Sequence, residues 1–398
     1  MRIKVIGAGV IGLFCARSLQ QDGHEVIVSD RGNIGTDKCS LGNSGIIVPS
    51  HFVPLAAPGM VSTGLKLLGD RKSPFRIKPT LDPALARWCL LFSKSCTRGH
   101  VDTTARVLCD LHLASKQLYL DFAAESGYSF GLQSRGLHLV CETQQRFEEE
   151  VEVCEMGQKL GLSVSVSRGG MELNGVEIMA HGSVHYADDC HLDPGRLLDC
   201  LFQDLQARGV EFEWGAESRF EGADGYVLAC GAMSGQVGKS LGLDIPVQPG
   251  KGLSYTVEPP QSPDAPMIFC EARVAVTPMG RGVRFGGTME LGEWSFSVDH
   301  LRLQGMVESV GRCIPAYSQM NRGPVWAGLR PCSPDGLPYI GPTSRPNLWV
   351  ATGHGMMGVS LAPVTGQLIA AAVRGEPVDT SLLPERFAKR GHGTIKQS

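Results

Sequence analysis

The stretch "RIKVIGAGVIGLFCARSLQQDGHEVIVSDR", residues Arg2–Arg31, combines a strand-like apolar run, a glycine-rich turn, a helical pattern and a second strand-like run. Three glycines form a G-x-G-x-x-G pattern directly after the first run: Gly7, Gly9 and Gly12. The first permits a tight turn, the second lets the backbone approach a pyrophosphate, and the third lets helix and strand pack closely. The helix start offers free N–H groups and a partial positive charge to phosphates, and Asp30 can accept hydrogen bonds from ribose hydroxyls. The stretch therefore predicts a dinucleotide site; the alternative is an ordinary helix-start turn with a surface aspartate.

Two later glycine-rich segments indicate which dinucleotide binds. "DGYVLACGAMSG" (Asp224–Gly235) is a strand-like run that leads into a turn of small residues, and "GHGMMG" (Gly353–Gly358) follows the strand-like "NLWVAT". A nicotinamide-dependent dehydrogenase usually has its nucleotide domain in one continuous block. Here the nucleotide-type segments lie at both ends and in the middle of the chain. We therefore expect FAD, an elongated dinucleotide that needs backbone contacts from distant segments.

Composition excludes several other classes of protein. The chain has 398 residues, of which 42% are hydrophobic and 19% charged, as in an ordinary globular protein of two domains or one large interleaved domain. A net charge of −3 argues against nucleic acid as a partner. The thirteen cysteines contain no C-x-x-C pair, so they predict neither a disulfide framework nor a metal site, and indicate reduced thiols in the cytoplasm. We expect no membrane span, but a peripheral contact at the inner face of the membrane stays open.

Four further segments carry a family resemblance: "CSLGNSGIIVPSHFVPLAAPG" (Cys39–Gly59), "HYADDCHLDPGRL" (His185–Leu197), "VTPMGRGVRFGGTMEL" (Val276–Leu291) and "WAGLRPCSPDGLPYIG" (Trp326–Gly341). Together they resemble the D-amino acid oxidase/glycine oxidase superfamily of flavoenzymes. Within it, the "PLAAPG" stretch and the tail that ends in "GHGMMG" are most similar to FAD-dependent D-amino acid dehydrogenases, with the D-hydroxyproline dehydrogenases as a close sub-group. The resemblance covers essentially the whole chain.

The resemblance and the local patterns together predict an α/β fold. We expect an FAD-binding Rossmann-like domain of the glutathione-reductase type from residues 1–50, 180–245 and 325–380. Residues 51–179 and 246–324 would form an interleaved α+β substrate domain with an antiparallel sheet, because runs such as "KGLSYTV" and "VRFGGTM" are β-rich. Apolar spacing predicts helices over 81–125 and 144–160. The polar tail 388–398 is predicted to be flexible.

The resemblance also implies which residues contact the cofactor. Besides the amino-terminal turn, these are the "LGNSGII" segment against the pyrophosphate and flavin edge, and "GHGMMG" at the opposite flavin edge. The candidate cofactor residues are Gly7, Gly9, Val10, Gly12, Asp30, Arg31, Asn43, Ser44, Gly45, Ile46, Ser218, Gly231, Gly353, Gly355, Met356, Met357 and Gly358. We expect the FAD to be non-covalent, because the flavin-bearing cysteine of the sarcosine oxidases aligns near Gly328 and not at Cys332.

The expected chemistry is oxidation of a carbon–nitrogen bond, which requires fixed geometry and a neutral amine more than a strong protein base. Arg330 matches the arginine that binds the substrate carboxylate in the glycine-oxidase branch, and guanidinium suits a carboxylate because it binds in a bidentate way. The alternative is a structural role for Arg330, paired with Asp335 or bonded to a loop carbonyl. Met356 and Met357 stand where glycine oxidases place a second arginine, so they imply an apolar wall.

Four other residues are weaker candidates. Tyr255 could bond the carboxylate or simply pack, and His51 could roof the pocket together with its neighbour Phe52. His354 could touch flavin or substrate, or act as a hydrogen-bonding strut. Lys251 could sit over the flavin N5, as lysines do in the sarcosine oxidases.

The sequence leaves three functions open. The first is a dehydrogenase that oxidises a D-amino or D-imino acid, such as a D-hydroxyproline, and passes electrons to a quinone or a carrier protein. The second is an oxidase of glycine or sarcosine-like substrates that uses oxygen. The third is a non-catalytic subunit of a multi-component dehydrogenase. The sequence does not give substrate chirality or oligomeric state.

Overall fold

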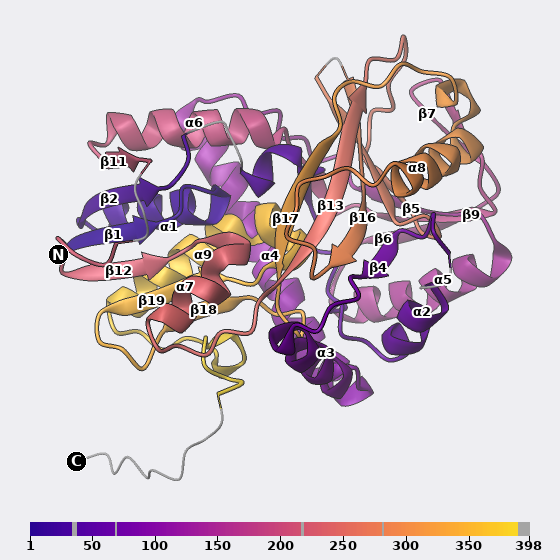
Figure 1. Cartoon of the computed structure of the whole chain (residues 1–398). Coiled ribbons are helices and arrows are strands. Elements are labelled where there is room, and N and C mark those ends of the chain that lie inside the picture. The colour runs from indigo at the N-terminus through magenta and orange to yellow at the C-terminus, as the bar shows by residue number, and fades with distance from the viewer. Residues whose placement is uncertain (34–37, 68–69, 216–218, 281, 389–398) are drawn as a thin grey trace.

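The computed structural model describes residues 1–33, 38–67, 70–215, 219–280 and 282–388. The predicted tail, apart from residue 388, and Ser218 lie outside these ranges. The described chain builds two large sheets, one on each side of the molecule in Figure 1, with helices packed around and between them.

The first sheet contains the nucleotide-type segments. Its strands are, in order across the sheet, β11 (Glu211–Trp214), β2 (Glu25–Asp30), β1 (Arg2–Ile6), β12 (Gly225–Leu228), β19 (Leu348–Thr352) and β18 (Tyr339–Pro342). Neighbours pair in parallel except β18 and β19, which are antiparallel. The inner strands are apolar and almost wholly buried, as expected of parallel strands covered on both faces. Segments from the beginning, middle and end of the chain therefore meet in one sheet, as the sequence predicted.

Three helices form the core beside this sheet. They are α1 (Val10–Gln21), α4 (Arg98–Ser126) and α9 (Gly358–Val373). α9 packs against both of the others, and a Cβ at Gly366 would lie 2.5 Å from the carbonyl oxygen of Phe14, so only glycine allows this approach. α9 and the turn before it, Gly355–Val373, are long and apolar enough to cross a membrane. Most of that segment is buried inside the fold, as in the core helix of a folded domain.

The second sheet is mainly antiparallel. Its strands run in the order β17 (Trp326–Cys332), β13 (Gln248–Val257), β16 (Gly282–Leu291), β15 (Val274–Met279), β14 (Met267–Phe269), β5 (Leu137–Cys141), β9 (Gly182–Tyr186) and β6 (Val164–Arg168), and β4 (Phe75–Ile77) pairs with the end of β16. β5 and β14 are parallel, as are β4 and β16. The sequence boundaries assigned residues 182–186 and 326–332 to the nucleotide domain, but these strands pair in the second sheet.

The remaining elements connect and cover the sheets. They are α2 (Met60–Leu67), α3 (Pro83–Ser95), α5 (Gln144–Lys159), α6 (Pro194–Ala207), α7 (Ser234–Ser240), α8 (His300–Cys313), and the short pairs β3 (Ile46–Ile47) with β10 (Cys190–His191) and β7 (Met171–Leu173) with β8 (Val176–Ile178). The helix predicted over 144–160 corresponds to α5. The helix predicted over 81–125 is two helices, because Thr97 caps α4 by accepting a hydrogen bond from the N–H of His100.

One buried ion pair fastens the carboxyl-terminal segment to the first sheet. The Arg386 guanidinium donates to both carboxylate oxygens of Asp335 at 2.7 and 2.8 Å, and lies 4.0 Å from the ring centroid of Tyr339. The two charged side chains are 11% and 7% exposed. Loss of one partner would leave an uncompensated charge in a buried position.

We therefore expect Asp335→Ala to lower the free energy of unfolding by about 3–5 kcal/mol, measured by urea denaturation. Asp110→Ala removes one partner of the exposed Arg106–Asp110 pair and should change it by less than about 1 kcal/mol. Equal effects of the two variants would contradict a special contribution from the buried pair.

Candidate active site

A cavity of about 1200 Å³ runs between the two sheets. Its wall is built by the turn between β1 and α1, the end of β2, the 3-10 turn η1 (Cys39–Gly42), β17, and the glycine turn that contains η4 (Gly355–Met357). These elements come from the two ends of the chain and from both sheets. The volume and the elongated lining suit a large ligand with a small co-ligand beside it.

The amino-terminal glycines shape one end of the cavity. Gly7 has a φ of +117°, and a Cβ there would lie 2.3 Å from the carbonyl oxygen of Ala229. A Cβ at Gly12 would lie 1.8 Å from the carbonyl oxygen of Gly7. By contrast, a Cβ at Gly9 would meet no protein atom within 4 Å, and Gly9 lines the cavity. Gly7 and Gly12 are thus explained by packing, whereas Gly9 leaves space for something outside the chain, as a pyrophosphate requires.

Asp30 is held at the end of β2 by three partners. Its Oδ2 accepts from the N–H of Ala8 at 2.7 Å, and its Oδ1 accepts from the N–H of Gly32 at 2.8 Å and lies 2.6 Å from Lys38 Nζ. Asp30, Arg31 and Lys38 all line the cavity. The sequence did not single out Lys38, because no local pattern joins it to Asp30 across the intervening residues.

The middle of the cavity is formed by the "LGNSGII" segment. Asn43 Oδ1 accepts from the N–H of Gly45 at 2.7 Å. Gly45 has a φ of +68°, and a Cβ there would lie only 2.0 Å from the carbonyl oxygen of Leu192. Arg284 fixes the turn by donating to the carbonyl oxygens of Leu41 and Asn43, both at 2.9 Å. The candidate cofactor residues line the cavity, except Gly12 and Gly45, which lie behind its wall, and Ser218, which lies outside the described residues.

The glycine turn places the start of α9 at the cavity. Gly353 and Gly355 have φ values of +80° and +55°, so both need glycine's freedom. Gly358, the first residue of α9, lines the cavity, and a helix start provides free N–H groups and a partial positive charge there. The side chain of His354 is 1% exposed and its Nε2 lies 2.9 Å from Thr365 Oγ1. Burial lowers its pKa to about 3, so His354 is a neutral strut between the turn and α9.

Arg330 projects from β17 into the cavity wall. Its guanidinium donates to the carbonyl oxygens of Thr288 at 2.6 Å and Gly287 at 3.4 Å. Among the described residues, no carboxylate lies within ion-pair distance of it. The alternative partner, Asp335, is bound by Arg386. The two carbonyls match the other alternative, a backbone carbonyl as the partner, although they lie on β16 and not in a loop. They are neutral, so the charge of Arg330 has no ionic partner among the described residues.

The strand next to Arg330 makes room for it. A Cβ at Gly252 on β13 would lie 2.2 Å from the Arg330 guanidinium, so any other residue would displace that side chain. Burial raises the pKa of the neighbouring thiols, Cys39 to about 11 and Cys332 to about 12, so neither brings a negative charge to Arg330 near neutral pH. Burial lowers the pKa of the guanidinium itself. An anionic ligand group fits this environment.

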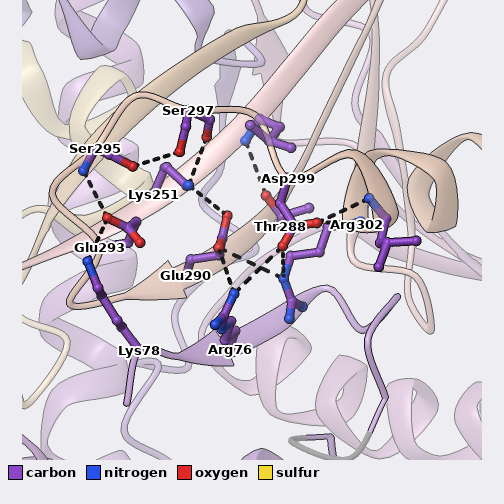
Figure 2. A network of polar contacts seen from close by, with 12 residues as sticks. Arg76, Lys78, Lys251, Thr288, Glu290, Glu293, Ser295, Ser297, Asp299 and Arg302 are labelled. Carbon is purple, nitrogen blue, oxygen red and sulfur yellow. Dashed lines mark hydrogen bonds and ion pairs between the residues drawn. The ribbon is translucent and has the colours of Figure 1, made fainter. Parts of the chain in front are cut away.

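Lys251 lies in a buried polar network away from the cavity. Its Nζ lies 2.9 Å from the carbonyl oxygen of Ser297 and 3.1 Å from Glu290 Oε1, with both charged side chains at most 3% exposed (Figure 2). Arg76 and Arg302 approach the other carboxylate oxygen of Glu290, each at 3.9 Å (Figure 2). The structure therefore contradicts the expectation that Lys251 sits over the flavin.

Tyr255 agrees with the second of its two alternatives, packing. Its ring stacks on Phe285 with a centroid distance of 5.1 Å inside the core of the second sheet, and Tyr255 is not part of the cavity lining. Its side chain packs in the core of the second sheet. His51 does line the cavity, whereas its neighbour Phe52 is fully buried beneath it and contributes no roof.

Comparisons with known proteins agree with this geometry. The family model described as "FAD dependent oxidoreductase" (DAO) matches residues 2–372. The D-amino acid dehydrogenase of Paramagnetospirillum magneticum is 30% identical over 410 aligned positions, which cover 96% of this chain and 97% of that protein. The D-amino acid dehydrogenase of Granulibacter bethesdensis is 29% identical, with 94% and 96% covered.

Solved structures show the same fold at lower identity. Glycine oxidase from Geobacillus kaustophilus has a TM-score of 0.77 at 20% identity, with 97% of this chain and 99% of that chain covered. L-proline dehydrogenase from P. horikoshii has a TM-score of 0.71 at 17% identity, with 97% of both chains covered. The cavity that fits a dinucleotide, the glycine turns at both ends of it and the family match over residues 2–372 together identify the chain as an FAD-dependent oxidoreductase of the DAO family.

Proposed function

We propose that the protein oxidises the carbon–nitrogen bond of a D-amino or D-imino acid, such as a D-hydroxyproline, and passes the electrons to a quinone or a carrier protein. The observation that carries this proposal is the Arg330 guanidinium, which lines the cofactor cavity with no carboxylate among its described partners. The names of the full-length relatives support an amino acid as the substrate class.

Different residues along the cavity would hold the cofactor and the substrate. Gly9, the α1 start and Asp30 would hold the nucleotide half of a non-covalently bound FAD, and the α9 start would face its flavin half. FAD, when bound, supplies the acceptor for the hydride that leaves the substrate α-carbon. Arg330 binds the substrate carboxylate and so fixes the α-carbon in one orientation, which is the main contribution that positioning can make to such a reaction. The imine product is then hydrolysed by water.

Two observations favour a dehydrogenase over an oxidase. A lysine over the flavin N5, as in the sarcosine oxidases, would favour reaction with oxygen, but the Lys251 ammonium group is bound to Glu290 and Ser297 outside the cavity. Several apolar side chains that line the cavity are also exposed, which places them at its opening: Val61 at 41%, Leu65 at 65% and Phe296 at 53%. An apolar opening suits a quinone acceptor. It is also compatible with a peripheral contact at the inner face of the membrane, which the sequence left open for a cytoplasmic protein.

Arg330→Ala should reduce catalytic efficiency toward the amino acid by about 2–5 kcal/mol of transition-state binding, roughly 30- to several-thousand-fold, because the substrate carboxylate loses its charged partner. Arg330→Lys should be similarly impaired, since it keeps the charge but loses the bidentate geometry. Gly252→Ala should act in the same direction by displacing the guanidinium. The measurement is anaerobic flavin bleaching across D- and L-amino acids, including both hydroxyproline epimers.

Arg345→Ala is the matched control, because Arg345 is exposed, does not line the cavity, and its side chain donates only to the carbonyl oxygen of Leu241 among the described residues. Bound FAD should survive all four substitutions. Near-normal efficiency of Arg330→Ala, or loss of FAD from it, would place the carboxylate site elsewhere. Bleaching by L-amino acids alone would contradict the proposed chirality.

The acceptor is tested on the same preparation. We expect substrate-reduced enzyme to reduce a dye or a short-chain quinone much faster than oxygen, because the Lys251 ammonium group is paired with Glu290 and Lys251 does not line the cavity. Peroxide release and dye reduction are measured in parallel under air. Peroxide formation at the rate of dye turnover would identify an oxidase.

A further inference from the structure

A buried carboxylate stands behind the cavity wall. Asp189 is 0% exposed and forms no ion pair among the described residues. Its Oδ1 accepts from the N–H of Ser50 at 3.0 Å and its Oδ2 is bonded to Ser50 Oγ at 2.5 Å. Burial without a cation penalises the charged form of a carboxylate, so this position of Asp189 is costly for the folded protein. A cost of this kind indicates that the carboxylate has a function.

The short β3–β10 ladder brings the two residues together. Ile46 pairs with His191 and Ile47 with Cys190 in antiparallel register, so Asp189 lies just beyond the ladder on one strand and Val48 on the other. A turn closed by the N–H of His51 and the carbonyl oxygen of Val48, at 3.0 Å, then returns Ser50 onto Asp189. A contact between residues 139 positions apart is thus fixed by one strand pair, two residues long, and one turn.

Ser50 connects this carboxylate to the cavity. Ser50 Oγ lies 3.2 Å from His51 Nδ1, and both Ser50 and His51 line the cavity that contains Arg330. Asp189 does not line it. The contacts therefore run from the His51 imidazole through the Ser50 hydroxyl to the Asp189 carboxylate, and the first two residues reach the cavity.

We propose that Asp189 accepts the proton that the substrate's ammonium group must lose, and that His51 and Ser50 carry it there. This inference rests on the proposed function. His51 is the residue that meets the substrate, and Ser50 and Asp189 act through it.

The transfer balances without any further reactant. With Asp189 ionised, Ser50 donates its O–H to the carboxylate and His51 donates Nδ1–H to Ser50 Oγ, which leaves Nε2 as an acceptor. One substrate N–H bond breaks as Nε2–H forms, Nδ1–H passes to Ser50 Oγ, and the Ser50 proton passes to Asp189 Oδ2. An ammonium and a carboxylate become an amine and a carboxylic acid, and the amine lone pair is free to assist departure of the α-hydride.

The surroundings tune the two ends of the relay differently. Burial raises the pKa of Asp189 to about 8, and the charge of Asp188 also raises it. The hydrogen bonds from Ser50 and the charge of Lys116 act in the opposite direction and lower it. Burial lowers the pKa of His51 to about 4, and the buried His112 nearby is likewise kept neutral. His51 therefore passes a proton on but does not retain it, while Asp189 is a base matched to mildly alkaline pH.

The decisive variant is Asp189→Asn, studied as the FAD-bound enzyme. Below a pH of about 8, wild-type Asp189 is already protonated and cannot accept, so the rate of anaerobic flavin reduction at low substrate should fall on the acid side of that pH. In Asp189→Asn only substrate that is already a neutral amine can react. The acid limb, the part of the pH profile in which the rate falls toward low pH, should then begin at the pKa of the substrate's own ammonium group. The rate should fall about tenfold for each pH unit between that pKa and the pKa of Asp189. Above that pH the two enzymes should converge.

Asp188→Asn is the matched control. Its carboxylate accepts from the N–H of Ser163 at 2.6 Å and makes no described bond to Ser50. Since its charge raises the pKa of Asp189, neutralising it should move the acid limb slightly down, opposite to Asp189→Asn. Ser50→Ala should reproduce the Asp189→Asn profile because it breaks the path, and Ser50→Thr should restore the wild-type profile because it keeps the hydroxyl. The Ser50→Ala and Ser50→Thr variants also test the relay if Asp189→Asn does not fold.

A second measurement needs no turnover. 2-Aminoisobutyrate, an amino acid without an α-hydrogen, should bind more tightly to the wild type as pH rises toward 8 because ionised Asp189 can accept its proton, whereas Asp189→Asn should show no such rise. Binding is followed by the change in flavin absorption. An unshifted acid limb in both Asp189→Asn and Ser50→Ala, with wild-type bleaching intact, would overturn the relay alone. If no amino acid bleaches the wild-type flavin, the proposed function and the relay are both overturned.

Discussion

The close contact of the β1–α1 turn with its own helix is the constraint on which the other parts of the site depend. Gly12 lies against the carbonyl of Gly7, and Gly7 lies against the carbonyl of Ala229 at the end of β12, at separations that no side chain permits. This contact fixes the α1 start beside the sheet edge and leaves Gly9 open toward the cavity. α9 packs on α1 through an equally close approach at Gly366, so the second helix start is positioned from the first.

The part of this arrangement that follows from local backbone requirements could be predicted from the sequence. Glycines at tight turns, buried parallel strands and an arginine in an apolar strand each leave a pattern within a few residues, and the positions of Gly9, Asp30 and Arg330 at one cavity agree with those patterns. β13 shows the limit. It is buried on both faces, so its sequence has no alternation that tells the cavity face from the core face. Gly252 faces Arg330, and the odd-numbered Lys251 and Tyr255 therefore point away from it.

Contacts between distant segments were beyond reach for a different reason. β9 and β17 are ordinary strands by composition. The sheet that each joins depends on its partner strands, which lie more than forty positions away except for the pairing of β9 with β6. The β3–β10 ladder is two residues long on each strand, too short to leave a pattern, yet together with the Val48–His51 turn it brings Asp189 to Ser50. The sequence shows two adjacent acids in "HYADDCHLDPG". It does not show that Asp189 is buried and that Asp188 is hydrogen-bonded at the surface.

The charges around the cavity have a common logic. Arg330 keeps its charge because planar guanidinium resists deprotonation even where burial lowers its pKa, and the thiols beside it stay protonated. His354 and His51 are kept neutral by the same burial, so neither histidine competes with the substrate for the positive charge. The α9 start adds a partial positive charge that does not titrate. A site built this way favours a bound anion at Arg330 over a wide pH range, while the protonation of a substrate amine depends on the carboxylate of Asp189 behind the wall. In the proposed mechanism, binding and proton removal belong to groups on different elements, so substitutions at Arg330 and at Asp189 are expected to affect them separately.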